Sequence, residues 1–103
     1  MRESDFQSHL IKELRRRFKG SFVIKNDPTY LQGFPDLLIL FNDQWAALEV
    51  KSSKNARRQP NQQYYIDDLN EMSFAAFIYP ENEEEVLDDL QRAFEFNRKS
   101  RIS

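Results

Sequence analysis

Apolar residues recur at the spacing of one-sided, buried helices in three stretches of the chain. The first predicted helix covers residues 4–18, and Gly20 ends it. The second begins at Pro60, since proline suits the first helical position, and the third follows Asn82, which we expect to cap it. The stripes of the three helices consist of Phe6, Leu10, Ile11, Leu14 and Phe18; Tyr65, Ile66, Leu69 and Met72; and Val86, Leu87, Leu90 and Phe94.

Four short apolar runs between these helices are typical of strands. They cover residues 21–25, 36–41, 45–51 and 74–79. The two central runs are apolar at both odd and even positions, so a sheet built from them needs cover on both faces. The sequence therefore predicts an α/β fold of order αβββαβα, a helix–sheet–helix sandwich in one domain, residues 1–103.

Three charged residues interrupt the central hairpin. If residues 42 and 43 form a two-residue turn, Asp36 lies directly opposite Glu49, with Cβ atoms about 5 Å apart on one face. Lys51 is two positions beyond Glu49 and shares that face. A four-residue loop keeps this arrangement, whereas a three-residue loop without a bulge breaks it. The even registers therefore bring all three charges together.

Two carboxylates that face each other in a sheet repel, and a divalent cation would relieve the repulsion. The chain has no cysteine and one histidine, His9, which excludes thiolate and histidine-rich metal sites. Carboxylate oxygens alone favour Mg²⁺ or Mn²⁺. The alternative is purely structural, with Asp36 capping a strand start and Glu49 pairing with Lys51 at the surface.

Two further polar residues lie on the inward stripes of their helices. At 100° per residue, Glu3 falls within about 20° of the centre of the first stripe. Gln62 precedes Tyr65 and Ile66 at the start of the second helix, where anions are favoured, and Gln63 is rotated away. The alternatives are that Glu3 precedes the first ordered turn and that Gln62 bonds only to its own backbone.

The net charge of −2 does not suggest a nucleic-acid-binding protein, but the basic residues are clustered. Lys54, Arg57 and Arg58 follow the hairpin with no acid between them. This run forms either a phosphate-binding loop or a solvated surface. No apolar run approaches the roughly 20 residues of a membrane span, and no signal peptide is recognisable. We therefore expect no membrane partner and a cytoplasmic location.

The motif "PD" followed by "EVK", in which Glu49 lies thirteen positions after Asp36, resembles the PD-(D/E)XK nuclease superfamily. Asp36, Glu49 and Lys51 match its two acids and its lysine. The "GFPD" segment, the glutamate opening the first helix and the glutamine opening the second resemble the small VRR-NUC and phage-type members. The resemblance implies a restriction-endonuclease-like core, a mixed four-stranded sheet flanked by helices, and the host cytoplasm if the chain is phage-encoded.

The resemblance further implies a Mg²⁺- or Mn²⁺-dependent endonuclease that hydrolyses DNA with little sequence specificity and selects DNA structure. Asp36, Glu49 and the carbonyl of Val50 would bind the metal, and Glu3 would add an auxiliary ligand. Lys51 would orient the attacking water or neutralise phosphate charge, and Gln62 would position the nucleophile or Lys51. The residues expected to bind DNA phosphates are Lys54, Arg57 and Arg58.

Three other functions remain open from the sequence. One is a Holliday-junction-resolvase-like enzyme, which would act as a homodimer or higher homo-oligomer. Another is a non-catalytic nucleic-acid-binding module on the same fold, which would keep the basic loop without needing the acids. The third is a structural or interaction protein, which accounts for the helices and strands but not for three converging charges.

Overall fold

The core of the fold is a mixed sheet of four strands in the order β1-β2-β3-β4. The computed structural model describes residues 2–102, with side chains described for residues 2–96. Strand β2 is antiparallel to both of its neighbours, β1 and β3, whereas β4 runs parallel to β3. The strands are β1 Phe22–Lys25, β2 Leu37–Phe41, β3 Gln44–Val50 and β4 Phe74–Ile78.

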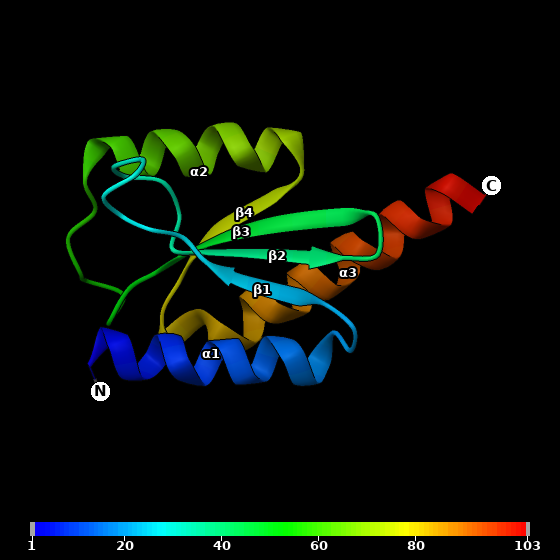
Figure 1. The fold of residues 1–103 in the computed structure, drawn as a ribbon, viewed down its shortest axis with the longest axis horizontal. Coiled ribbons are helices and arrows are strands. Elements are labelled where there is room, and N and C mark those ends of the chain that lie inside the picture. The colour runs from blue at the N-terminus through cyan, green and yellow to red at the C-terminus, as the bar shows by residue number, and fades with distance from the viewer. Residues whose placement is uncertain (1, 103) are drawn as a thin grey trace.

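Helices cover both faces of this sheet, as the apolar pattern of the central strands predicted. The helices are α1 Glu3–Arg17, α2 Pro60–Met72 and α3 Glu83–Ile102, with a short 3₁₀ helix, η1, at Pro80–Asn82. Helix α2 lies on one face, and α1 and α3 lie on the other (Figure 1). Because β3 and β4 are parallel, α2 serves as the crossover between them. The α/β sandwich and the predicted order of its elements are confirmed.

Each face of the sheet has its own hydrophobic core, because successive strand residues point to opposite faces. The larger core joins α1 and α3 to the sheet and contains Phe6, Leu10, Leu14, Phe18, Leu37, Ile39, Ala46, Leu48, Val50, Ile78, Val86, Leu87, Leu90 and Phe94. The smaller core, under α2, contains Ala47, Ile66, Ala75 and Phe77. Glu49 alternates with Leu48 and Val50, so its side chain belongs to the α2 face.

The hairpin has the two-residue turn that the sequence analysis assumed. Phe41 pairs with Gln44, and Leu37 pairs with Leu48. Asn42 has a φ of 58°, a left-handed conformation that asparagine adopts more readily than most residues. One step beyond the last pair, this register places Asp36 opposite Glu49.

The structure corrects the sequence prediction at Asn82 and at Met72. Asn82 does not cap α3 but belongs to η1, where its side chain accepts a hydrogen bond from the Tyr79 amide at 2.8 Å and donates one to the Phe77 carbonyl at 3.1 Å. Met72, the last residue of α2, is 67% exposed. Periodicity gives the direction of a side chain, but it does not show whether the sheet extends beneath it.

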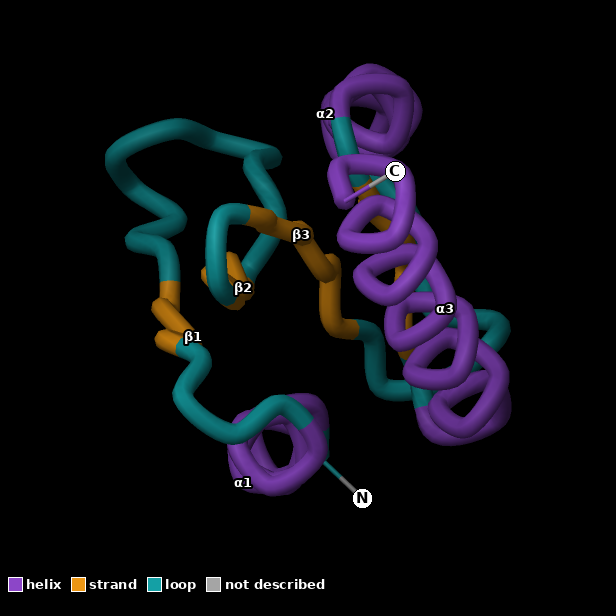
Figure 2. Tube along the Cα trace, turned by 90° about the vertical axis from the view of Figure 1, so that its right-hand side faces the viewer, coloured by secondary structure: helices purple, strands orange, loops and turns teal. Residues whose placement is uncertain are grey.

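The loop that joins β1 to β2 lies on the same side of the sheet as α2 (Figures 1 and 2). The side-chain amide of Asn61, in α2, donates a hydrogen bond to the Gln32 carbonyl of this loop at 3.2 Å.

Within the described part of the chain, no helix is both long enough and apolar enough to cross a membrane.

Candidate active site

The predicted site residues meet at one end of the sheet, where β2 begins and β3 ends. Helices α1 and α2 also begin at this end (Figure 1). Asp36 immediately precedes β2, and Glu49 and Lys51 lie at the end of β3. Gln62 lies in the first turn of α2, and Glu3 is the first residue of α1. Four elements distant in sequence therefore contribute to one site.

Asp36 is held by backbone groups on two sides. The Val50 amide donates a hydrogen bond to its Oδ2 atom at 2.8 Å. The Asp36 carbonyl accepts a hydrogen bond from the Asn26 amide at 2.8 Å, and the Asn26 side chain donates to the Pro35 carbonyl at 2.7 Å. These contacts direct the carboxylate of Asp36 toward the end of β3, beside Glu49.

Glu49 is buried, with 4% of its surface exposed. The pKa of its carboxyl group is raised from 4.5 to about 8, chiefly by burial and also by the negative charge of Asp36 and a hydrogen bond between the two side chains. Without a cation, Glu49 therefore carries a proton at neutral pH, and its carboxyl group lies against Asp36. This arrangement excludes the alternative in which Glu49 is a surface residue.

Lys51 is also buried, at 7% exposure. Its Nζ atom donates hydrogen bonds to the Arg57 carbonyl at 2.9 Å and to Gln62 Oε1 at 2.8 Å. Among the described side chains, Lys51 forms no ion pair with a carboxylate. The predicted Glu49–Lys51 surface pair is therefore absent, although the ammonium group is close enough to lower the pKa of Glu49 against the effects that raise it.

Gln62 connects the lysine to the acid. Its Oε1 atom accepts hydrogen bonds from Lys51 Nζ and from the Gln59 amide at 3.0 Å. Its Nε2 atom donates to Glu49 Oε2 at 3.2 Å. The amide orientation follows from chemistry, because an ammonium group can only donate. Gln62 therefore bonds both to the backbone at the start of its own helix and to two site residues, and its role in catalysis stays a prediction. Gln63 is exposed, and its side chain bonds to Asp67.

Glu3 lies at the rim of the site and is exposed. Partial burial raises the pKa of its carboxyl group, and the negative charge of Asp36 adds to this effect, whereas Lys51 opposes it. The helical angle predicted a position in the middle of the core-facing stripe. That prediction is wrong, because α1 begins at Glu3 and the core that α1 covers begins at Phe6.

The basic loop is attached to the site through its backbone. The Arg57 carbonyl binds Lys51, and the Lys54 amide donates to both carboxylate oxygens of Glu81 at 3.3 and 3.2 Å. The guanidinium carbon of Arg58 lies 4.0 Å from the centre of the Phe77 ring. The residues Lys54, Arg57 and Arg58 are exposed. Their charged groups are therefore accessible beside the site.

Few groups at this site could supply oxygen ligands to a metal ion. Among the described residues, no cluster of three or more carboxylate, imidazole or thiolate side chains is arranged to hold a metal ion. The Lys51 amide donates to Ile78 of β4, so the amide and carbonyl of Val50 point the other way, toward β2 and Asp36. Two adjacent carboxyl groups beside a backbone carbonyl suit a hard divalent cation, which would replace the proton of Glu49.

Sequence reasoning missed Asn26, whose two hydrogen bonds hold the segment that carries Asp36. Its partners are nine and ten positions away, and no local periodicity or turn motif links residues at those separations. Its position at the end of a strand was the one available signal.

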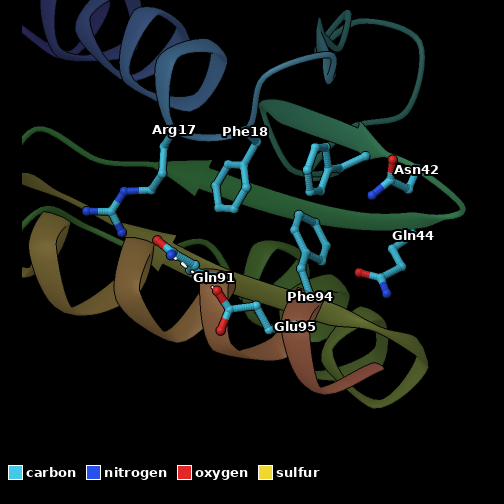
Figure 3. Close-up of a pocket in the computed structure, with 8 residues that line it drawn as sticks. Arg17, Phe18, Asn42, Gln44, Gln91, Phe94 and Glu95 are labelled. Atoms are coloured by element: carbon cyan, nitrogen blue, oxygen red, sulfur yellow. Dashed lines mark hydrogen bonds between the residues drawn. The ribbon is translucent and has the colours of Figure 1, made fainter. Parts of the chain in front are cut away.

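A hollow of about 220 Å³ lies at the opposite end of the sheet, near the hairpin turn. The rings of Phe18, Phe41 and Phe94 line it, and Figure 3 shows Phe18 and Phe94 with Gln91 bonded to Glu95 beside them. Arg17 at its edge pairs with Asp88 at 2.9 Å. Aromatic rings and charged groups that already have partners provide little for catalysis, so the candidate active site is at the Asp36 end.

Comparisons of the chain with models of protein families, with curated proteins and with solved structures found no match.

Proposed function

We propose that this chain is a Mg²⁺- or Mn²⁺-dependent endonuclease of the PD-(D/E)XK type that hydrolyses DNA phosphodiester bonds on a restriction-endonuclease-like core. One observation carries the proposal: Asp36 and Glu49 oppose each other at a sheet end, and the buried Lys51 lies beside them. A buried carboxyl group with a strongly raised pKa, here Glu49 beside the second acid Asp36, is typical of functional sites. It would also destabilise a protein that made no use of it.

Asp36, Glu49 and the Val50 carbonyl would hold the cation, and Glu3 at the rim would be an auxiliary ligand. When bound, the cation would stabilise charge developing on the phosphate and lower the pKa of a water molecule. The Val50 amide holds Oδ2 of Asp36 in place, which orients that carboxylate before any ligand arrives. Such preorganisation is what electrostatic catalysis requires.

Lys51 would act on the phosphate or on the attacking water. Two of its three N–H donors are directed to Arg57 and Gln62, so the third is available to a substrate oxygen. Gln62 would position the ammonium group and Glu49 relative to each other, because it bonds to both. Lys54, Arg57 and Arg58 would bind backbone phosphates, contacts that position DNA without reading its sequence.

The test is nicking of supercoiled plasmid DNA by the purified protein in Mg²⁺, Mn²⁺, Ca²⁺ and EDTA. We expect cleavage with Mg²⁺ and Mn²⁺ and none in EDTA. Asp36→Asn, Glu49→Gln and Lys51→Met keep the volume of each side chain, so each should remain folded and lose most cleavage. A folded Asp36→Asn variant that cuts at the wild-type rate, or robust activity in EDTA, would refute the proposal. Four-way junctions and plain duplex, assayed in parallel, would show whether the enzyme selects junctions.

A further inference from the structure

The loop between β1 and β2 encloses a hollow next to the candidate active site. Its volume is about 310 Å³, and its lining residues are Asn26, Asp27, Tyr30, Leu31 and Phe34. This volume is at the lower end of the range for sites that bind small organic groups. Asn26, which lines the hollow, donates hydrogen bonds to the backbone of Pro35 and Asp36. The hollow therefore lies next to the backbone segment that carries the Asp36 carboxylate.

Contacts with α2 hold the loop in place. Asn61 donates to the Gln32 carbonyl at 3.2 Å. Gly33 has a φ of 87°, and a Cβ atom added there would overlap the Asn61 side chain. The Phe34 ring packs edge-on against Tyr65 with centroids 5.4 Å apart. The hollow is thus formed before any ligand binds.

Tyr30 presents an aromatic ring at the mouth of this hollow. Its surface is 88% exposed, and no ring contact joins it to another described residue. Tyr64 is 63% exposed and packs on Tyr65, which in turn packs on Phe34. Exposed aromatic rings next to a cleft offer stacking surfaces for planar ligands, and nucleobases use such surfaces regardless of sequence.

Asp27 adds a hydrogen-bond acceptor to the lining. Its Oδ1 atom accepts hydrogen bonds from the amide and hydroxyl of Thr29 at 2.9 and 2.7 Å. These bonds lower the pKa of the carboxyl group, so the group is ionised and can only accept. It would repel a phosphate but would bind the amino edge of a base, as carboxylates bind the N4 amino group of cytosine. A planar ring with N–H donors therefore fits this hollow, whereas an anion does not.

We propose that the hollow beside Tyr30 binds an unpaired nucleobase, so that the DNA substrate carries a single-stranded segment next to the scissile phosphate. In a duplex, the faces of each base are stacked on its neighbours, so only an unpaired base can present its ring to Tyr30 and its amino group to Asp27 at the same time. The inference rests on the proposed function and specifies its substrate class.

The test measures binding by fluorescence anisotropy in Ca²⁺, with a single-stranded oligonucleotide about 12 nucleotides long and with the blunt duplex of the same length. Tyr30→Ala should weaken single-strand binding by about 5- to 150-fold, the range for loss of one stacked base. It should leave duplex binding unchanged. Because Tyr30 is exposed, the substitution should not unfold the protein. Tyr30→Phe, which keeps the ring, should restore binding, and Phe96→Ala is the control for removal of another exposed aromatic side chain.

Equal single-strand affinity of Tyr30→Ala and wild type would overturn the inference, as would tighter wild-type binding to the duplex. Tighter binding of a matched RNA oligonucleotide would overturn the assignment to DNA. Cleavage assays in Mg²⁺ on the same substrates separate the two proposals. Normal cleavage without any effect of Tyr30 would refute the base site alone. Binding that depends on Tyr30, without cleavage of any DNA, would refute the nuclease and support the base site.

Discussion

The side chain of Gln62 donates a hydrogen bond to the carboxyl group of Glu49 across 3.2 Å, which ties the first turn of α2 to β3. The same amide accepts a hydrogen bond from Lys51. A neutral group therefore joins a buried cation to a buried acid that would otherwise have to pair directly. The ammonium group of Lys51 therefore lies near the carboxyl groups without forming an ion pair with either of them among the described side chains.

Loss of the Gln62 amide should reduce turnover more than substrate binding. Gln62→Ala removes one of the acceptors of Lys51 and the donor to Glu49, and loss of such supporting contacts commonly lowers activity about 10- to 100-fold. We expect kcat for cleavage to fall while KM changes little. Gln63→Ala is the matched control, because Gln63 is exposed and bonds only to Asp67 in the described structure. Equal kinetics for the two variants would contradict a positioning role.

The stability of the metal-free protein should fall as the pH rises. The pKa of Glu49 is about 8 in the folded protein, above its ordinary value, so the folded state holds this proton more tightly than the unfolded chain does. The resulting stabilisation is complete below pH 4.5 and is lost as the pH rises to about 8. Thermal unfolding in EDTA should show this fall, and Glu49→Gln should remove it.

The control for this measurement is Glu13→Gln. Glu13 bonds to Arg16, and this contact lowers the pKa of its carboxyl group. Its titration therefore lies below the window in which Glu49 titrates, and the variant should keep the wild-type slope there. A flat wild-type profile between about pH 5 and pH 8 would mean that Glu49 is ionised in the folded state.

Mg²⁺ should reverse this loss of stability. A cation bound by Asp36 and Glu49 would replace the proton of Glu49, so it should bind more tightly as the pH approaches 8. At about 100 times its dissociation constant, it should stabilise the protein by about 2.7 kcal/mol. The increase in Tm on adding Mg²⁺ should be larger at about pH 8 than at pH 6, and Asp36→Asn should abolish it. A shift in Asp36→Asn equal to that of wild type would place the ion elsewhere.

The basic loop should contribute to the salt dependence of DNA binding. If Lys54, Arg57 and Arg58 contact phosphates, each adds about 0.9 to the slope of log K against log salt. Replacing all three with alanine should flatten the slope by roughly two to three units on every sequence. Binding of duplex DNA in Ca²⁺ across a salt series measures this. The control is Arg16→Ala, since Arg16 pairs with Glu13 on α1; a change confined to that variant would place the DNA along α1.

Gly33→Ala should destabilise the protein more than Gly20→Ala. Both glycines have positive φ values, 87° and 90°, so both substitutions strain the backbone, by about 1 kcal/mol or more. A Cβ atom at Gly20 would meet nothing within 4 Å, whereas one at Gly33 would overlap the Asn61 side chain. Asn61 would have to move and lose its bond to the β1–β2 loop. Chemical denaturation measures the difference, which should shrink when Asn61→Ala is combined with Gly33→Ala.

The elements of the fold and the meeting of Asp36 with Glu49 could be predicted from the chain alone. A strand places alternate side chains on opposite faces, so the apolar pattern of the hairpin required helices on both sides. A two-residue turn then determined the register. Helical spacing likewise placed Gln62 on the inward face of α2. Each of these relations follows from the spacing of residues within one element, or from counting residues outward from the hairpin turn.

The tertiary structure decided which groups these side chains contact. Lys51 binds Gln62 and the Arg57 carbonyl rather than a carboxylate, and Glu3 lies at the rim because α1 begins there. The raised pKa of Glu49 depends on the depth of its burial. The hollow beside Tyr30 exists because α2 holds the β1–β2 loop through Asn61 and Tyr65. Periodicity specifies the direction of a side chain, whereas its partners and its burial depend on segments that only the folded chain brings together.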